Sequence, residues 1–191
     1  MSEKYKLYIK NMVCPRCVMA VQDILDMLNF PYIEVRLGEV VLKEPRDNYN
    51  LEMLKTKLHK IGFELIEDQQ LQIVESIKNF IIDLVRNPEE KKNPYNFSIY
   101  LADKIGKNYH YLSNLFSEKE GITIEKYMIR QRIEYTKELL IYDELSLSEI
   151  AWKLNYSSIA HLSNQFKQIT GFSPTAFKKL QHKNRNPLDY L

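Results

Sequence analysis

Two cysteines, Cys14 and Cys17, are separated by two residues, and their thiols have the most distinctive chemistry in the chain. Thiolates are soft ligands that favour soft ions such as Cu(I), and two sulfurs at this spacing can face one ion. The segment Cys14-Pro15-Arg16-Cys17 also matches a thiol redox pattern. Two cysteines in 191 residues do not make a disulfide framework. Three interpretations stay open: a soft-metal site, a thiol switch, and a domain that only makes contacts, without chemistry at the cysteines.

A second pattern of polar side chains occurs twice, fifty positions apart. Leu112-Ser113-Asn114-Leu115-Phe116 is followed by Gly121, and Leu162-Ser163-Asn164-Gln165-Phe166 is followed by Gly171. Each copy comes after a short apolar helix and a turn, so the repeat predicts two helix-turn-helix units. Units of this kind place the second helix, the recognition helix, in the major groove of duplex DNA.

The side chains that would face DNA follow from helical periodicity. If the apolar residues of each recognition helix pack inward, the polar ones lie on one outer stripe. These stripes are His110, Ser113, Asn114 and Ser117 in the first unit, and His161, Asn164, Gln165 and Gln168 in the second. Asn bonds adenine bidentately, so the stripes predict some preference for A·T pairs. Basic side chains are expected on phosphates, at Lys104, Lys107, Arg130, Lys153, Lys167, Lys178 and Lys179.

The elements that position the cysteines are short. Residues 5–12 alternate apolar and basic side chains, as in a half-buried strand, and residues 18–28 have helical periodicity. Two β-rich runs on either side of Gly38 predict a hairpin, and an amphipathic helix ending at Gly62 precedes a last strand at 63–66. The order βαββαβ is the ferredoxin-like arrangement. We therefore predict an α+β chain, with a ferredoxin-like domain in 1–68 and an all-α double helix-turn-helix domain in 72–185.

The second part is helical throughout. A wide apolar face runs through 73–85, and a charged, proline-containing stretch at 87–94 interrupts it. Residues 123–142 predict a helix of about five turns between the two units. Trp152 lies on the supporting helix of the second unit, and we expect it in the core.

Helix ends in this part carry recognisable signals. Ser146 with Glu149 forms a capping box if Ser146 is the N-cap, and Ser148 is the alternative cap. Pro174 fits the first turn of a last helix.

Residues 72–181 resemble the DNA-binding domain of the bacterial AraC/XylS family of transcription regulators. The likeness is carried by Leu147-Ser148-Glu149-Ile150-Ala151, Tyr156-Ser157-Ser158, Leu162-Ser163, Phe166-Lys167, Gly171-Phe172-Ser173-Pro174 and Phe177-Lys178. It implies base contacts at His110, Ser113, Asn114, Ile159, Ala160, His161 and Asn164. Two positions depart from the family. Asn155 replaces a turn glycine, where a positive φ is expected, and Asn164 replaces a frequent arginine, so the preferred base should differ.

Residues 4–67 resemble the heavy-metal-associated (HMA) domain of copper chaperones and metal-pump ATPases. The likeness is carried by Met12-Val13-Cys14-Pro15-Arg16-Cys17 between a strand and a helix, with Gly62-Phe63 opposite. It implies that Cys14 and Cys17 hold Cu(I) or another soft ion. The dipole of the following helix is expected to stabilise the Cys17 thiolate. Arg16 between the cysteines favours thiolates but repels a cation.

Composition limits the other classes of function. No run approaches the ~18 apolar residues of a membrane helix, and the N-terminus has no signal-peptide pattern, so we expect a cytoplasmic, nucleoid-associated protein without a membrane partner. Residues 1–70 carry 10 basic and 11 acidic side chains, and residues 71–191 carry 17 and 14, so the second part suits a polyanion better. We identify no Gly-rich phosphate loop and no convincing catalytic triad, and do not expect an enzyme.

The motifs together favour a sequence-specific transcription regulator that binds double-stranded DNA and contacts RNA polymerase or another protein. No cofactor is required, although a soft metal ion or thiol redox state sensed at Cys14 and Cys17 would suit the first domain. The alternative is a metallochaperone-like protein whose main activity lies in the CxxC domain. That alternative leaves the repeated helix-turn-helix unexplained. The oligomeric state stays open.

Overall fold

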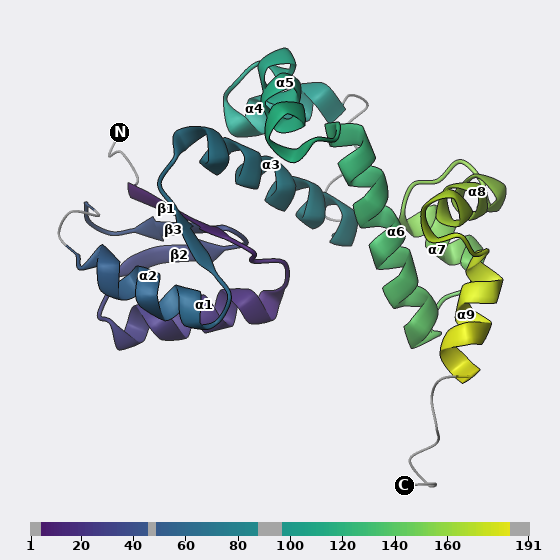
Figure 1. Cartoon of the computed structure of the whole chain (residues 1–191), viewed down its shortest axis with the longest axis horizontal. Coiled ribbons are helices and arrows are strands. Elements are labelled where there is room, and N and C mark those ends of the chain that lie inside the picture. The colour runs from purple at the N-terminus through teal and green to yellow at the C-terminus, as the bar shows by residue number, and fades with distance from the viewer. Residues whose placement is uncertain (1–4, 46–48, 88–96, 184–191) are drawn as a thin grey trace, which may run out of the picture. The chain divides into compact units, whose positions relative to one another are not determined.

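The computed structural model describes residues 5–45, 49–87 and 97–183 (Figure 1). Contacts divide the chain into two compact units, residues 1–80 with 96–121 and residues 81–95 with 122–191. The sheet domain thus groups with the first helix-turn-helix, and the long middle helix with the second. The division into domains 1–68 and 72–185 follows the change in secondary structure and stays a prediction.

The N-terminal domain is a four-stranded antiparallel sheet with two helices. Its elements in chain order are β1 (Tyr5–Lys10), α1 (Pro15–Met27), β2 (Tyr32–Arg36), β3 (Glu39–Leu42), α2 (Leu51–Lys60) and β4 (Glu64–Ile66). The predicted order βαββαβ is confirmed. The strands lie in the order β2-β3-β1-β4, so β1 is central, with Leu7 opposite Val40 and Ile9 opposite Leu65.

The core of this domain lies between one face of the sheet and the two helices. Leu7 and Ile9 are buried while Lys6 and Lys10 form ion pairs with glutamates, because successive side chains of a strand point to opposite faces. The buried face receives an apolar stripe from each helix. The buried helical side chains are Val21, Ile24 and Leu25 from α1, and Leu54 and Leu58 from α2.

The β2–β3 turn depends on a glycine. Gly38 has φ +70°, a left-handed conformation that glycine adopts without steric penalty. Its Cα faces Asn79, so closely that an added Cβ would lie 1.7 Å from Asn79 Nδ2. Asn79 belongs to the helix that follows the sheet, so the glycine also lets that helix approach the turn.

The second part of the chain consists of helices, as predicted. They are α3 (Gln69–Arg86), α4 (Phe97–Ile105), α5 (Tyr109–Glu120), α6 (Ile124–Tyr142), α7 (Leu147–Lys153), α8 (Ile159–Thr170) and α9 (Pro174–Lys183). Pro174 begins α9, and Thr123 caps α6 by accepting a hydrogen bond from the Lys126 N–H at 3.2 Å. Most of the predicted break at 87–94 lies outside the described residues. Within the described ranges no helix is both long and apolar enough to cross a membrane.

Candidate nucleic-acid interface

The first helix-turn-helix consists of α4, a turn at residues 106–108, and the recognition helix α5. Asn108 begins α5, because its side-chain oxygen accepts a hydrogen bond from the Tyr111 N–H at 2.8 Å. Gly121, with φ 68°, ends the helix and donates its N–H to the Ser117 carbonyl. The side chains of α5 that anchor it in the core are Leu112, Leu115 and Phe116.

The second helix-turn-helix consists of α7, a turn at residues 154–158, and the recognition helix α8. Ser146 is the N-cap of α7 and forms the complete capping box with Glu149, which decides between the two predicted caps. Ser158 begins α8 by accepting from the His161 N–H at 3.1 Å. Gly171, with φ 79°, ends α8 as Gly121 ends α5. The two units are therefore structural repeats, as predicted.

The turn of the second unit contains the family departure noted above. Asn155 has φ 56°, which confirms the expected positive φ. Asparagine tolerates this conformation better than most residues. The first unit uses Gly106, with φ 72°, for its left-handed turn residue.

The predicted base contacts of the first unit lie on the outer side of α5. His110 and Asn114 are exposed, and Ser113 is half-buried. The Asn114 side-chain nitrogen lies 3.1 Å from His110 Nε2. An amide nitrogen can only donate, so Asn114 donates one of its two N–H groups to His110 Nε2. That contact leaves Asn114 with one free N–H group and leaves His110 Nε2 without a free lone pair.

The predicted base contacts of the second unit, Ile159, Ala160, His161 and Asn164, are all exposed. His161 Nδ1 lies 3.0 Å from the Ser157 hydroxyl, and its ring meets the Tyr156 ring edge to face, with centroids 5.3 Å apart. The two recognition helices therefore present similar residue types whose hydrogen-bonding capacity is used differently.

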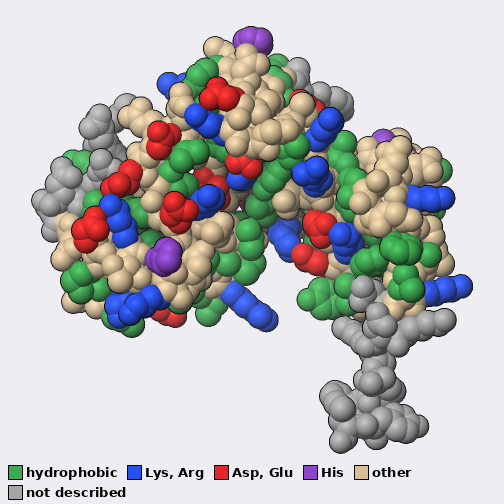
Figure 2. Space-filling view, viewed as in Figure 1, with side chains coloured by type: hydrophobic (Ala, Val, Ile, Leu, Met, Phe, Trp, Pro, Cys, Tyr) green, Lys and Arg blue, Asp and Glu red, His purple; other side chains and the backbone are tan. Residues whose placement is uncertain are grey.

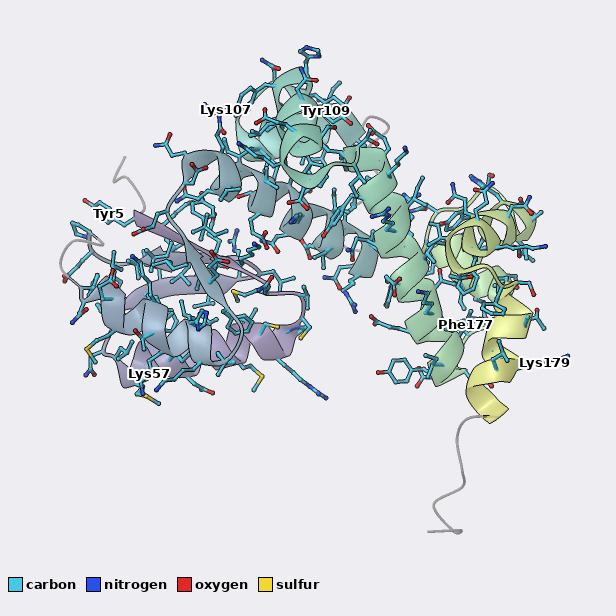
Figure 3. All side chains as sticks on the ribbon, in the orientation of Figure 1. Tyr5, Lys57, Lys107, Tyr109, Phe177 and Lys179 are labelled. Carbon is cyan, nitrogen blue, oxygen red and sulfur yellow. The ribbon has the colours of Figure 1, made fainter. Side chains whose placement is uncertain are left out.

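The basic residues expected on phosphates are mostly available. Lys104, Lys107, Arg130, Lys167 and Lys179 are exposed, and Lys153 is half-buried. Lys178 is half-buried and forms an ion pair with Asp143 at the end of α6. Lys107 lies at the turn of the first unit and Lys179 on α9 (Figure 3). On the face drawn in Figure 2, basic and acidic side chains are interspersed rather than gathered in one basic patch.

The prediction that Trp152 lies in the core is wrong. Its side chain is 75% exposed on α7. The inner face of α7 is formed by Ile150 and Ala151, with Leu154 just after the helix. A residue two positions after Ile150 lies about 200° around the helix and so points outward. The helical spacing alone predicts this outward direction. The expectation of a core position rested on the size and apolar character of tryptophan.

The cysteines lie where the loop after β1 enters α1. Cys14 is the N-cap residue and Cys17 is in the first turn, and their sulfurs are 3.4 Å apart. Both are free thiols with intermediate exposure. The Cys17 backbone N–H and thiol lower the pKa of the Cys14 thiol, with smaller contributions from the Arg16 N–H and guanidinium. The lowered pKa of the Cys14 thiol thus comes from groups in the first turn of α1, and the expected stabilisation of the Cys17 thiolate stays a prediction.

The donor set suits a two-thiolate site for a soft ion. Two sulfurs lie within reach of one ion, and one of them ionises more readily than an ordinary thiol. Among the described residues, no three or more His, Cys, Asp or Glu side chains come together in a group able to hold a metal. A structural zinc site takes four such ligands, so the cysteine pair does not match one.

Comparison with known proteins identifies the helical part. Residues 101–180 match the family model described as a helix-turn-helix domain. The chain is 30% identical over 78 residues to the regulatory protein PocR of Salmonella typhimurium, covering 41% of this chain and 26% of that protein. It is 25% identical over 139 residues to the Msm operon regulatory protein of Streptococcus mutans, covering 71% and 50%. The C-terminal domain of AraT, a response regulator from Geobacillus stearothermophilus, has a similar fold, with a TM-score of 0.51 at 22% identity over 65% of this chain and 94% of that one. The chain thus spans between a quarter and a half of these two curated relatives.

Proposed function

We propose that this chain, which carries an AraC-family helix-turn-helix DNA-binding domain in its C-terminal part, is a sequence-specific regulator of transcription. The observation that carries the proposal is the repeat. Two helix-turn-helix units with matching caps each present exposed polar side chains on the second helix. A solvated helix face has no reason to occur twice with a polar N-cap, a left-handed glycine at its end and a buried leucine and phenylalanine at corresponding positions.

In this proposal α5 and α8 enter successive major grooves of one duplex, about 10 bp apart. Asn114 and Asn164 contact base edges, where an asparagine amide pairs bidentately with adenine. The exposed lysines contact phosphates, which position the protein without specifying sequence. Because the charge is mixed, the affinity should depend only moderately on salt.

The experiment is selection of DNA sequences from a random pool by the full chain, followed by footprinting. Asn114→Ala and Asn164→Ala should each relax the preference at one base position, by about 1–3 kcal/mol. Lys179→Ala should lower the affinity for all DNA sequences by a similar factor. Gln70→Ala, which removes an exposed amide from the first turn of α3, is the matched control. It should change neither the base preference nor the overall affinity for DNA. A single protected groove segment per monomer, or unchanged selection by both asparagine variants, would contradict the proposal.

We further propose that residues 1–68 form a ferredoxin-like, HMA-type domain that senses a soft metal ion or thiol redox state at Cys14 and Cys17. The strand order, the 3.4 Å between the sulfurs and the lowered pKa of the Cys14 thiol support this role. Cys14 and Cys17 would hold such an ion as thiolates, and release of their protons would change the charge of the loop before α1.

A line of charged contacts supports communication between this loop and the first recognition helix. The Asn11 backbone N–H, three residues before Cys14, donates to Glu75 of α3. Glu75 is only 6% exposed and lies 3.9 Å from Lys78, whose ammonium lies 2.6 Å from Glu120 at the end of α5. Burial raises the pKa of the Glu75 carboxyl, and Lys78 opposes that rise. All four residues belong to one compact unit, so a shift of the loop can bias the position of α5.

The sensing role is tested by titrating operator affinity with Cu(I) under reducing conditions. Binding of Cu(I) that disappears in the Cys14→Ser, Cys17→Ser double variant, together with a change in operator affinity, would support metal sensing. A change produced by oxidation alone would support the thiol switch. Lys78→Met should keep Cu(I) binding and lose the change in affinity. Absence of binding and of any change under both conditions would reject sensing at this site.

A metallochaperone-like function for the whole chain is not favoured, because it gives the helix-turn-helix repeat no role. We propose double-stranded DNA as the principal partner. RNA polymerase or another protein is the partner through which the DNA-bound chain affects transcription. Co-purification of polymerase on operator DNA, with and without the chain, tests the second contact.

A further inference from the structure

The interval from the left-handed turn residue to the N-cap of the recognition helix is one residue longer in the second helix-turn-helix unit than in the first. In the first unit, Asn108 caps α5 two positions after the left-handed Gly106. In the second, Ser158 caps α8 three positions after the left-handed Asn155. This interval holds Tyr156 and Ser157 in the second unit, next to the start of α8, and Lys107 alone in the first.

Both of these turn residues contact His161, an exposed side chain in the first turn of α8. The Ser157 hydroxyl lies 3.0 Å from Nδ1, and the Tyr156 ring meets the imidazole at an interplanar angle of 86°. Tyr156 is itself fixed, since it is only 8% exposed and the Arg132 guanidinium lies 5.8 Å from its ring centroid. An exposed histidine would otherwise sample several rotamers, whereas this one is held on two sides.

The hydrogen bond to Ser157 determines what the other ring nitrogen can do. Neutral imidazole has one N–H donor and one acceptor nitrogen. Nδ1 lies near the start of α8, where the helix dipole places partial positive charge and favours a lone pair over a proton. A Ser157 hydroxyl that donates to Nδ1 leaves the single proton of the neutral ring on Nε2.

We propose that Tyr156 and Ser157 are positioning residues that hold His161 with its Nε2–H free to donate to an acceptor on a base edge in the major groove. Guanine fits best, because its O6 and N7 are both acceptors. The second unit would then specify a G·C pair next to the base contacted by Asn164. This proposal rests on the proposed DNA-binding function.

The first unit handles its histidine differently. His110 Nε2 accepts from the Asn114 amide at 3.1 Å, so that nitrogen has no proton to offer a base. Fifty positions before Tyr156 and Ser157 stand Gly106 and Lys107, which provide neither a ring nor a hydroxyl. The two units therefore differ in the first base position that each specifies.

The experiment combines a ring-tautomer measurement with sequence selection, both on the full chain. ¹⁵N NMR of the imidazole ring should show His161 protonated at Nε2, and selection should return guanine at one position of the second half-site. Ser157→Ala should raise the fraction of ring protonated at Nδ1 and lower discrimination at that position about three- to ten-fold. Ser157→Thr, which keeps the hydroxyl, and Tyr156→Phe, which keeps the ring, should behave as the wild type.

His161→Ala should abolish the guanine preference and leave the other positions unchanged. If Ser157→Ala leaves both the tautomer and the selected base unchanged while the chain still selects DNA, the positioning role is overturned and the DNA-binding function stands. If the wild-type chain selects no sequence at all, the DNA-binding function fails, and this proposal fails with it.

Discussion

Gly38→Ala should destabilise the N-terminal part strongly, for two separable reasons. Alanine at φ +70° occupies the left-handed region, which costs about 1–2 kcal/mol. Its Cβ would also lie 1.7 Å from Asn79 Nδ2 and 2.7 Å from Asn79 Cγ, so the asparagine or its helix must move. Overpacking of this kind costs about 1–3 kcal/mol, which brings the expected total to about 2–5 kcal/mol.

The two contributions can be separated with a matched glycine. Gly62 has φ +83°, and an added Cβ there meets nothing within 4 Å, so Gly62→Ala should cost only the conformational part, about 1–2 kcal/mol. Asn79→Ala removes the obstructing amide, and Gly38→Ala in that background should cost the same smaller amount. The steric part then appears as a coupling of about 1–3 kcal/mol between positions 38 and 79.

The assay is urea denaturation of the four variants and the wild type, followed by far-UV circular dichroism. Asn79→Ala alone should have a small effect, because its buried Oδ1 has no hydrogen-bond partner among the described residues. Equal losses for Gly38→Ala and Gly62→Ala, or no rescue by Asn79→Ala, would refute the close approach of α3 to the β2–β3 turn.

Three further outcomes are expected. Hydrogen bonds from Ser146 lower the pKa of the Glu149 carboxyl below its ordinary value of 4.5, so its stabilising effect is complete above that pH and is lost as the pH falls through the lowered pKa. Glu149→Gln should therefore lower the melting temperature at neutral pH and match the wild type in strong acid. Trp152→Ala should leave stability within about 0.5 kcal/mol, because the side chain is 75% exposed, and should weaken DNA binding of every sequence if α7 crosses the DNA backbone. Arg86→Met should cost about 1–2 kcal/mol, because Arg86 donates two hydrogen bonds, of 3.0 and 2.6 Å, to a partly exposed Glu138.

Each of these three predictions can be contradicted by one specific result. A melting difference for Glu149→Gln that persists in acid would show that the carboxylate charge is not the cause. Trp152 is the single tryptophan of the chain, so unchanged fluorescence on DNA addition would place α7 away from the duplex. A loss below about 0.3 kcal/mol for Arg86→Met would mean that the pair behaves as an ordinary surface ion pair.

The amino-acid sequence by itself determined the order of the elements and the helix-turn-helix repeat. Alternation at 5–10 and the three- and four-residue steps of the helices depend on neighbours close in the chain, and so do caps such as Ser146 and Ser158. The left-handed conformation of Asn155 was also expected, from the family resemblance, because the family usually has glycine at this turn position.

Only the tertiary structure decided the features that depend on distant residues or on side-chain direction. It lowered the pKa of the Cys14 thiol through its contacts with Cys17 and Arg16, and it grouped the first helix-turn-helix with the sheet domain. It also joined Glu75 to Glu120 through Lys78, across 45 positions of sequence. Such contacts carry no periodic signal, because burial and charge pairing are set by which surfaces meet after the elements have formed. For that reason the types of the DNA-facing residues could be predicted from the sequence, while the way in which each histidine is held could not.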